Sequence, residues 1–102
     1  MDRLDALKKL AAQNPADNFV RYALATELTN AGRLAEAAAE YEAIVAANPD
    51  YSAAYFQAGQ VLERLGRAGE AREFYRRGIE VTTRAGEGHA RDQLQAALDA
   101  LG

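Results

Sequence analysis

The sequence offers few side chains that could perform chemistry. Its 102 residues include one histidine, one serine and no cysteine. A serine hydrolase would need Ser52 and His89 in contact, but both are expected at the starts of widely separated helices, where Ser52 serves as a helix N-cap. The segment GEGHA at 86–90 follows no expected strand, so it is not a dinucleotide-binding loop. Metal ligands are not clustered along the chain either. The sequence therefore predicts a protein that is not an enzyme and uses no metal or cofactor.

The overall composition narrows the range of partners. The net charge is −3, whereas proteins that bind nucleic acid usually concentrate lysine and arginine. No apolar run approaches the roughly 18 residues that would span a membrane. The first residues, MDRLDALKKL, carry acid where a signal peptide carries base, and no apolar segment follows them. We therefore expect a soluble cytoplasmic protein with neither nucleic acid nor a membrane among its partners.

Apolar residues recur at helical spacing along nearly the whole chain. Asn-Pro pairs at 14–15 and 48–49 end two of the expected helices, because the residue before a proline is pushed out of the helical region. Gly32 and Gly66 end two more, in positions that commonly need a positive φ. No window alternates with period two, so no strand is expected. The spacing predicts an all-α protein with six helices, near 4–13, 18–31, 35–47, 53–65, 69–82 and 90–101.

Sliding the sequence on itself by 34 residues reveals an internal repeat. The identical pairs fall at the turn between two helices and at the contact between them, where geometry tolerates little variation. They are Leu28 with Leu62, Gly32 with Gly66, Arg33 with Arg67, Glu36 with Glu70, Ala37 with Ala71 and Tyr41 with Tyr75. A fixed period of this length is typical of helical repeat arrays.

The repeat resembles the tetratricopeptide repeat (TPR), whose pattern is W-x2-L-G-x2-Y, then A-x3-F, then P. The first repeat here has Arg21-x2-Leu24-Ala25-x2-Leu28, then Ala37-x3-Tyr41, then Pro49. The second has Tyr55-x2-Ala58-Gly59-x2-Leu62, then Ala71-x3-Tyr75, with Thr83 in place of proline. The resemblance implies a right-handed α-solenoid of antiparallel helix pairs. It divides one domain, 1–102, into an N-terminal capping half-repeat (1–15), two repeats (18–49 and 52–83) and a C-terminal capping helix (87–102).

Three positions depart from the family pattern. Arg21 stands where a large aromatic residue is usual. Gly78 replaces the residue that pairs with Ile44, and we expect it to loosen the last helix pair. Thr83 replaces the final proline, which should let the last helix leave the strict register of the repeat.

In the resembled family, the first helix of each repeat lines a groove that receives an extended peptide or a partner helix. The matching positions are Phe19, Tyr22, Thr26, Thr29, Phe56, Gln57, Gln60 and Arg64. Rings would bury apolar area while amides and hydroxyls bond the guest backbone. Tyr22 and Phe56 fit a purely structural role in the core equally well. Family members that grip a peptide carboxylate present lysine and asparagine on these faces, which this sequence does not.

Two functions remain open at this point. The favoured one is a non-catalytic adaptor whose groove binds a peptide or another segment of a partner protein. The alternative is an assembly element that associates through its end helices, for which exposed apolar area on the first or last helix would be the sign. Because the first and last helices each combine an apolar stripe with a charged face, we expect a monomer.

Overall fold

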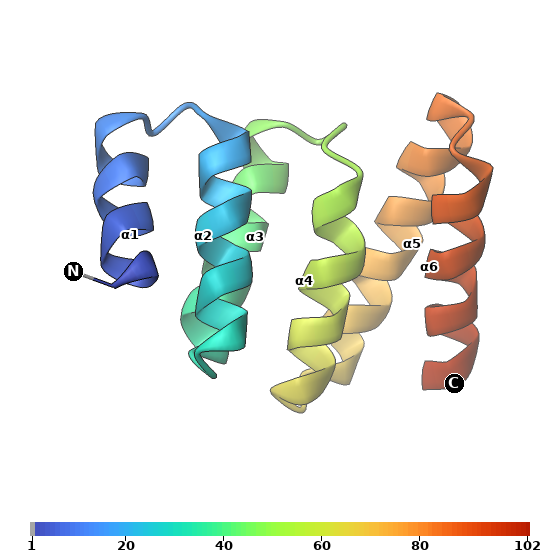
Figure 1. Ribbon diagram of the computed structural model, residues 1–102. Coiled ribbons are helices and arrows are strands. Elements are labelled where there is room, and N and C mark those ends of the chain that lie inside the picture. Colours follow the sequence, from blue (N-terminus) through green and yellow to red (C-terminus); the bar gives the residue numbers. More distant parts are fainter. Residues whose placement is uncertain (1) are drawn as a thin grey trace.

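The computed structural model describes residues 2–102, which form six α-helices and, within that range, no strand (Figure 1). The helices are α1 (Arg3–Gln13), α2 (Asn18–Asn30), α3 (Leu34–Ala47), α4 (Ala53–Arg64), α5 (Ala68–Ala85) and α6 (Gly88–Leu101). The predicted fold class and number of helices are therefore confirmed.

Each helix packs chiefly against the helix that follows it in the sequence. In Figure 1, α2, α4 and α6 stand side by side, with α3 and α5 behind them. The result is an elongated array with principal extents of 40 × 28 × 19 Å. Because every helix meets its sequence neighbours, short turns are enough to build the whole array.

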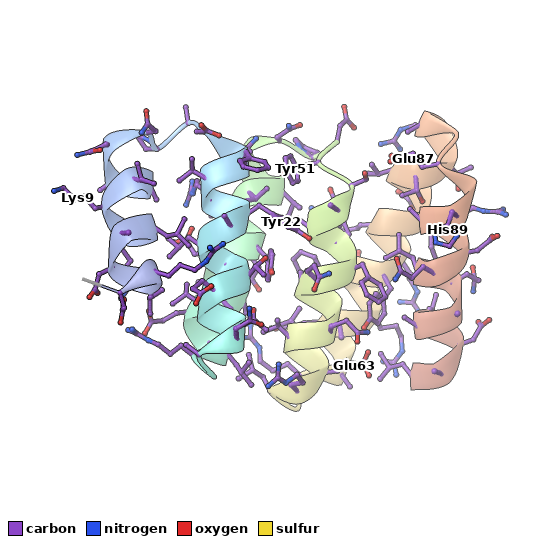
Figure 2. The ribbon with its side chains drawn as sticks, viewed as in Figure 1. Lys9, Tyr22, Tyr51, Glu63, Glu87 and His89 are labelled. Atoms are coloured by element: carbon purple, nitrogen blue, oxygen red, sulfur yellow. The ribbon has the colours of Figure 1, made fainter. Side chains whose placement is uncertain are left out.

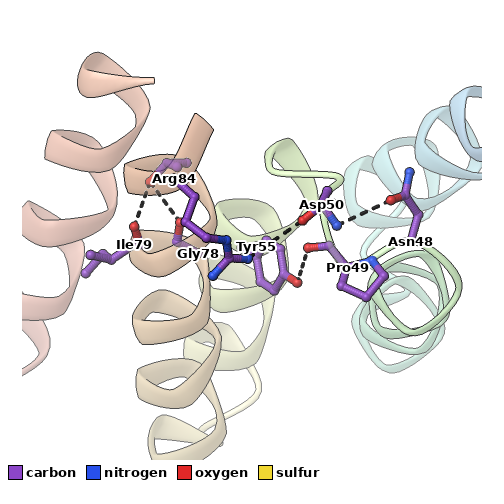
Figure 3. Close-up of polar contacts among 8 residues, drawn as sticks. Asn48, Pro49, Asp50, Tyr55, Gly78, Ile79 and Arg84 are labelled. Carbon is purple, nitrogen blue, oxygen red and sulfur yellow. Dashed lines mark hydrogen bonds and ion pairs between the residues drawn. The ribbon is translucent and has the colours of Figure 1, made fainter. Parts of the chain in front are cut away.

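Local signals set the ends of the helices. The Asp17 carboxylate caps α2 by accepting hydrogen bonds from the backbone N–H groups of Phe19 and Val20, at 3.0 and 3.3 Å. Gly32 and Gly66 both have φ of +77°, as the sequence predicted for the residues that follow α2 and α4. After α3, the turn is held by Tyr55, whose hydroxyl donates to the Pro49 carbonyl at 2.5 Å (Figure 3).

The core is built from small residues packed against tyrosines. Ala25, Ala37 and Ala71 are fully buried at the helix crossings, and the rings of Tyr41 and Tyr75 are buried beside them. At Gly59 the approach is closest, since an added Cβ would lie 2.1 Å from Tyr75 Cε1. The small side chains therefore let the backbones of paired helices come together, while the tyrosines fill the space between them.

The expectation that Gly78 loosens the last helix pair is wrong. A Cβ added at this position would lie 2.7 Å from Tyr55 Cβ and 3.0 Å from Leu94 Cδ1. Gly78 is thus the point at which α4 and α6 both approach α5 closely. The missing side chain is what makes this contact tight, because any larger residue would hold the helices apart.

Helix α5 extends beyond its predicted end near Thr82. It continues to Ala85 and is closed by Gly86, which has φ of +71°. The hydroxyl groups of Thr82 and Thr83 donate to backbone carbonyls of the preceding turn, at 2.8 and 2.6 Å. Since no proline follows, nothing in the chain forces the helix to stop at the position where α3 stops.

None of the helices within residues 2–102 combines the length and the apolar character needed to cross a membrane.

Candidate functional site

A pocket of about 260 Å³ opens on the face shared by α2, α4 and α6. We call this the first-helix face. Three residues predicted from the sequence line the pocket: Tyr22 from α2, and Phe56 and Gln57 from α4. The remaining lining residues are Ser52, Ala53, Ala90, Gln93 and Leu94. Rings and side-chain amides from three helices therefore meet at one surface.

Tyr22 belongs both to the packing and to the surface. Its ring lies 5.6 Å from the ring of Tyr41 and 5.8 Å from that of Tyr51, measured between centroids. Figure 2 shows Tyr22 and Tyr51 together in the region between α2 and α4. Partial burial raises the pKa of Tyr22, with the nearby tyrosines Tyr41 and Tyr51 adding to the effect. One side of the ring is thus anchored while the residue still lines the pocket.

Phe56 is anchored in a similar way. Its ring centroid lies 6.3 Å from that of Tyr75, and the residue is half-buried. The two aromatic residues of the pocket therefore have fixed positions, and neither is entirely enclosed in the core. Rings held in this manner lose little freedom when a ligand packs on them.

Three of the predicted polar residues already have partners inside the protein. Thr26 Oγ1 and the Tyr41 hydroxyl share a hydrogen bond of 3.1 Å. Gln60 Nε2 donates to the Tyr75 hydroxyl at 2.6 Å. The Thr29 hydroxyl donates to the Ala25 carbonyl at 2.8 Å, one turn earlier in α2. These side chains are hydrogen-bond partners of two tyrosine hydroxyl groups and of a backbone carbonyl in α2, so their first role is structural.

Five of the eight predicted residues lie outside the pocket lining: Thr26, Thr29 and Gln60, whose partners are given above, and also Phe19 and Arg64. Phe19, at the start of α2, is 76% exposed. Arg64, at the end of α4, is also exposed. Neither lines the pocket, although both belong to helices that do. The structure therefore gathers Tyr22, Phe56 and Gln57, and leaves Phe19 and Arg64 at the margins of the same two helices.

Sequence reasoning missed the third wall of the pocket, which α6 supplies through Ala90, Gln93 and Leu94. The sequence predicts only a capping helix for residues 87–102. The signal that identifies the third wall is the 34-residue shift, which carries Phe56 to Ala90 and Gly59 to Gln93.

Ser52 is the N-cap residue of α4, as the sequence predicts, but its side chain makes no capping hydrogen bond to that helix. Instead, its hydroxyl donates to Glu87 Oε2 at 3.2 Å, so the starts of α4 and α6 lie next to each other rather than far apart. Figure 2 shows Glu87 and His89 together at the start of α6. The bond pins the start of α6 to α4 and so helps to shape the pocket.

The described residues contain no group of three or more His, Cys, Asp or Glu side chains that could hold a metal ion. Every buried side-chain nitrogen and oxygen among them has a hydrogen-bond partner.

Beside the pocket, Tyr75, Gln60 and Glu63 form a polar cluster. The Tyr75 hydroxyl donates to Glu63 Oε2 and accepts from Gln60. Burial raises the pKa of Tyr75 above its usual value, and the hydrogen bond to Glu63 raises it further. The folded protein therefore holds this proton at a pH where the unfolded chain releases it.

A pH-dependent loss of stability should follow from this cluster. As the pH rises above about 10, the free energy of unfolding should fall, since the folded state binds more protons than the unfolded state. Tyr75→Phe should reduce that fall, and should cost about 1 kcal/mol at neutral pH by removing the hydrogen bonds. Urea unfolding at several pH values measures both effects, with Tyr51→Phe as the control. An unchanged pH slope in Tyr75→Phe would contradict the assignment.

Comparison with known proteins gives the same architecture. The family model of the tetratricopeptide repeat matches residues 22–90. The chain is 36% identical to a tetratricopeptide repeat domain protein from Salinibacter ruber, whose solution NMR structure superposes with a TM-score of 0.81 over 86% of this chain and 89% of that chain. No curated protein matches the sequence.

Two less similar structures share the fold. A solution structure of a protein from Bordetella parapertussis has 22% identity and a TM-score of 0.83, over 99% of this chain and 88% of that chain. The crystal structure of MamA has 20% identity and a TM-score of 0.75, over 96% of this chain and 64% of that chain. With the repeat spacing, the six helices and the matched residues 22–90 taken together, this chain belongs to the tetratricopeptide repeat family.

Proposed function

We propose that the protein is a non-catalytic adaptor that binds an extended segment of a partner protein on its first-helix face. The observation that carries the proposal is the pocket in which Tyr22, Phe56 and Gln57 meet Gln93 of α6. TPR domains generally serve as protein–protein interaction modules. We propose further that the protein acts as a monomer in the cytoplasm, in keeping with its acidic, cysteine-free composition.

The chemistry of the pocket suits a peptide guest. An extended peptide presents backbone N–H and C=O groups on its edges and side chains on alternate faces. Gln57 and Gln93 each carry one acceptor and two donor hydrogens, so they can bond either backbone group. Tyr22 and Phe56 can bury an apolar side chain of the guest between them. Aromatic residues are enriched at such interfaces because they bury a large area with few rotatable bonds.

One observation favours the alternative, in which the protein assembles through an end helix. Leu10 of α1 is 44% exposed, although it corresponds at the 34-residue spacing to Ile44, which is fully buried. An exposed leucine on a terminal helix offers apolar area that a second molecule can cover. Sedimentation at increasing protein concentration tests this, since a mass that grows with concentration would favour assembly over the monomer.

A capture experiment tests the adaptor function. Immobilised wild-type protein and Gln57→Ala/Gln93→Ala would be incubated with extract of the source cells, and the bound proteins identified by mass spectrometry. A partner bound through both amides should be bound about tenfold less tightly by the double variant, because each lost hydrogen bond costs about 0.5–1.5 kcal/mol. Circular dichroism should show unchanged helix content.

Gln95→Ala is the matched control, because Gln95 is an exposed amide of α6 that bonds Asp99 and does not line the pocket. It should retain the partner as the wild type does. Equal capture by all three proteins would mean that the first-helix face is idle. Capture of further copies of this chain alone would favour assembly.

A further inference from the structure

A second and larger groove, of about 480 Å³, is lined by residues of α1, α2 and α3. We call it the α1–α3 groove. Its size falls within the range of about 300–1,000 Å³ that is typical of ligand pockets. Its apolar lining comes from Ala11 and Ala12 of α1, Leu24 and Leu28 of α2, and Ala39 of α3. None of these residues belongs to the pocket on the first-helix face.

The internal repeat shows what fills the equivalent space elsewhere in the molecule. A shift of 34 residues carries Arg21 to Tyr55 and Glu40 to Phe74. Tyr55 and Phe74 are both buried, with ring centroids 6.2 Å apart. In the first repeat, Arg21 and Glu40 form an ion pair of 3.3 Å in place of these two tilted rings. The α1–α3 groove is therefore a space that two aromatic rings occupy in the second repeat.

The same shift identifies a hydrogen-bond acceptor in the groove. It carries Pro15 to Pro49, whose carbonyl accepts the hydrogen bond from the Tyr55 hydroxyl at 2.5 Å (Figure 3). Pro15 lines the α1–α3 groove, and no donor within residues 2–102 bonds its carbonyl. A ligand tyrosine in the position that Tyr55 occupies in the second repeat would supply that donor.

The charges of the groove favour an acidic guest. Glu36 is paired with Arg33 at 2.6 Å, and Glu40 is paired with Arg21. Lys8 lines the groove from α1, and in the described part of the chain no carboxylate pairs with it. Among the charged side chains that line the groove, Lys8 is thus the one without an opposite partner. Its positive charge complements a negative residue on the ligand.

From these observations we infer that the α1–α3 groove binds a tyrosine side chain of a partner protein that stands next to an acidic residue. The ring packs on the alanines and leucines, the hydroxyl donates to the Pro15 carbonyl, and the neighbouring carboxylate pairs with Lys8. This site shares no residue with the first-helix face, so either proposal can fail without the other.

Short blocked peptides can test the inference on the full chain. Isotope-labelled protein would be titrated with Ac-Asp-Tyr-NH2, Ac-Asp-Leu-NH2 and Ac-Lys-Tyr-NH2 while backbone amide shifts are recorded by NMR. We expect Ac-Asp-Tyr-NH2 to bind in the millimolar range and to shift the amides of Ala12, Leu24 and Ala39. The other two peptides should bind more weakly, because one lacks the ring and hydroxyl and the other lacks the carboxylate.

Two variants separate the features of the site. Arg21→Tyr/Glu40→Phe copies the second repeat into the first, so the rings should fill the groove and abolish the shifts. Lys8→Gln should weaken binding of Ac-Asp-Tyr-NH2 about two- to fivefold, which is the worth of a partly exposed ion pair. The matched control is Lys9→Gln, because Lys9 is exposed and points away from the helices in Figure 2. Lys8→Gln keeps the test decisive if the double variant does not fold.

Three outcomes would overturn the inference. The first is an absence of shifts with Ac-Asp-Tyr-NH2. The second is a set of shifts confined to Tyr22, Phe56 and Gln57, which would place the peptide on the first-helix face. The third is a set of groove shifts that grow with protein concentration before any peptide is added, which would make a second copy of the chain the occupant.

Discussion

Leu94→Ala is expected to lower the free energy of unfolding by about 2–5 kcal/mol, the usual cost of removing a fully buried leucine side chain. Leu94 is 1% exposed and is the only buried residue of α6. It sits over Gly78, where α4 and α6 both approach α5. Without this side chain α6 keeps only half-buried contacts, so the end of the array should fray at a lower denaturant concentration than the rest.

Urea unfolding followed by circular dichroism measures this loss. Leu98→Ala is the matched control, since Leu98 lies one turn further along α6 and is only half-buried. It should cost clearly less than Leu94→Ala, because the apolar area taken from the core is smaller. Equal losses in the two variants would show that α6 is held along its whole length rather than at one residue.

The Leu94→Ala substitution should also alter the candidate site, because Leu94 lines the pocket on the first-helix face. Partner binding should therefore weaken in Leu94→Ala and remain close to wild type in Leu98→Ala. Comparing partner binding by the two variants shows whether binding depends on the Leu94 side chain in the pocket or on α6 as a whole.

Gly59→Ala is expected to destabilise the protein by about 1–3 kcal/mol, the typical cost of overpacking a core. This expected loss of stability is opposite in sign to the effect of helix propensity, which favours alanine over glycine by about 1 kcal/mol in a helix interior. The steric effect dominates because the new Cβ would lie 2.1 Å from Tyr75 Cε1. The Tyr75 ring is fully buried, and its hydroxyl is held by Gln60 and Glu63, so it has little room to move aside.

Gly69→Ala provides the matched control in the first turn of α5. A Cβ added at Gly69 would meet nothing within 4 Å, and the residue is exposed. This variant should be neutral or more stable by up to about 1 kcal/mol. Melting temperatures of the two variants should therefore move in opposite directions, or Gly59→Ala alone should move. A melting temperature of Gly59→Ala at or above that of the wild type would refute the close contact.

The helices, their order and much of the face they share could be predicted from the amino-acid pattern alone. Asp17, Asn48-Pro49 and the glycines at 32 and 66 act within a few residues of their own positions, so their effect can be predicted without knowing the fold. The 34-residue spacing then placed Tyr22 and Phe56 at equivalent positions of two helices, and helical periodicity put Gln57 beside them. These residues do line one pocket.

The contacts between residues far apart in the chain could not be predicted in this way, because they depend on how the helices pack. Gly78 was predicted to loosen a contact that it makes tight, because its neighbours Tyr55 and Leu94 come from two other helices. The bond between Ser52 and Glu87, 35 residues apart, joins two helix starts and brings α6 into the pocket. The ion pair between Arg21 and Glu40 leaves open a groove whose counterpart holds two rings. Each outcome depends on where helices cross, and a pattern along one chain carries the period of a helix but not the geometry of its crossings.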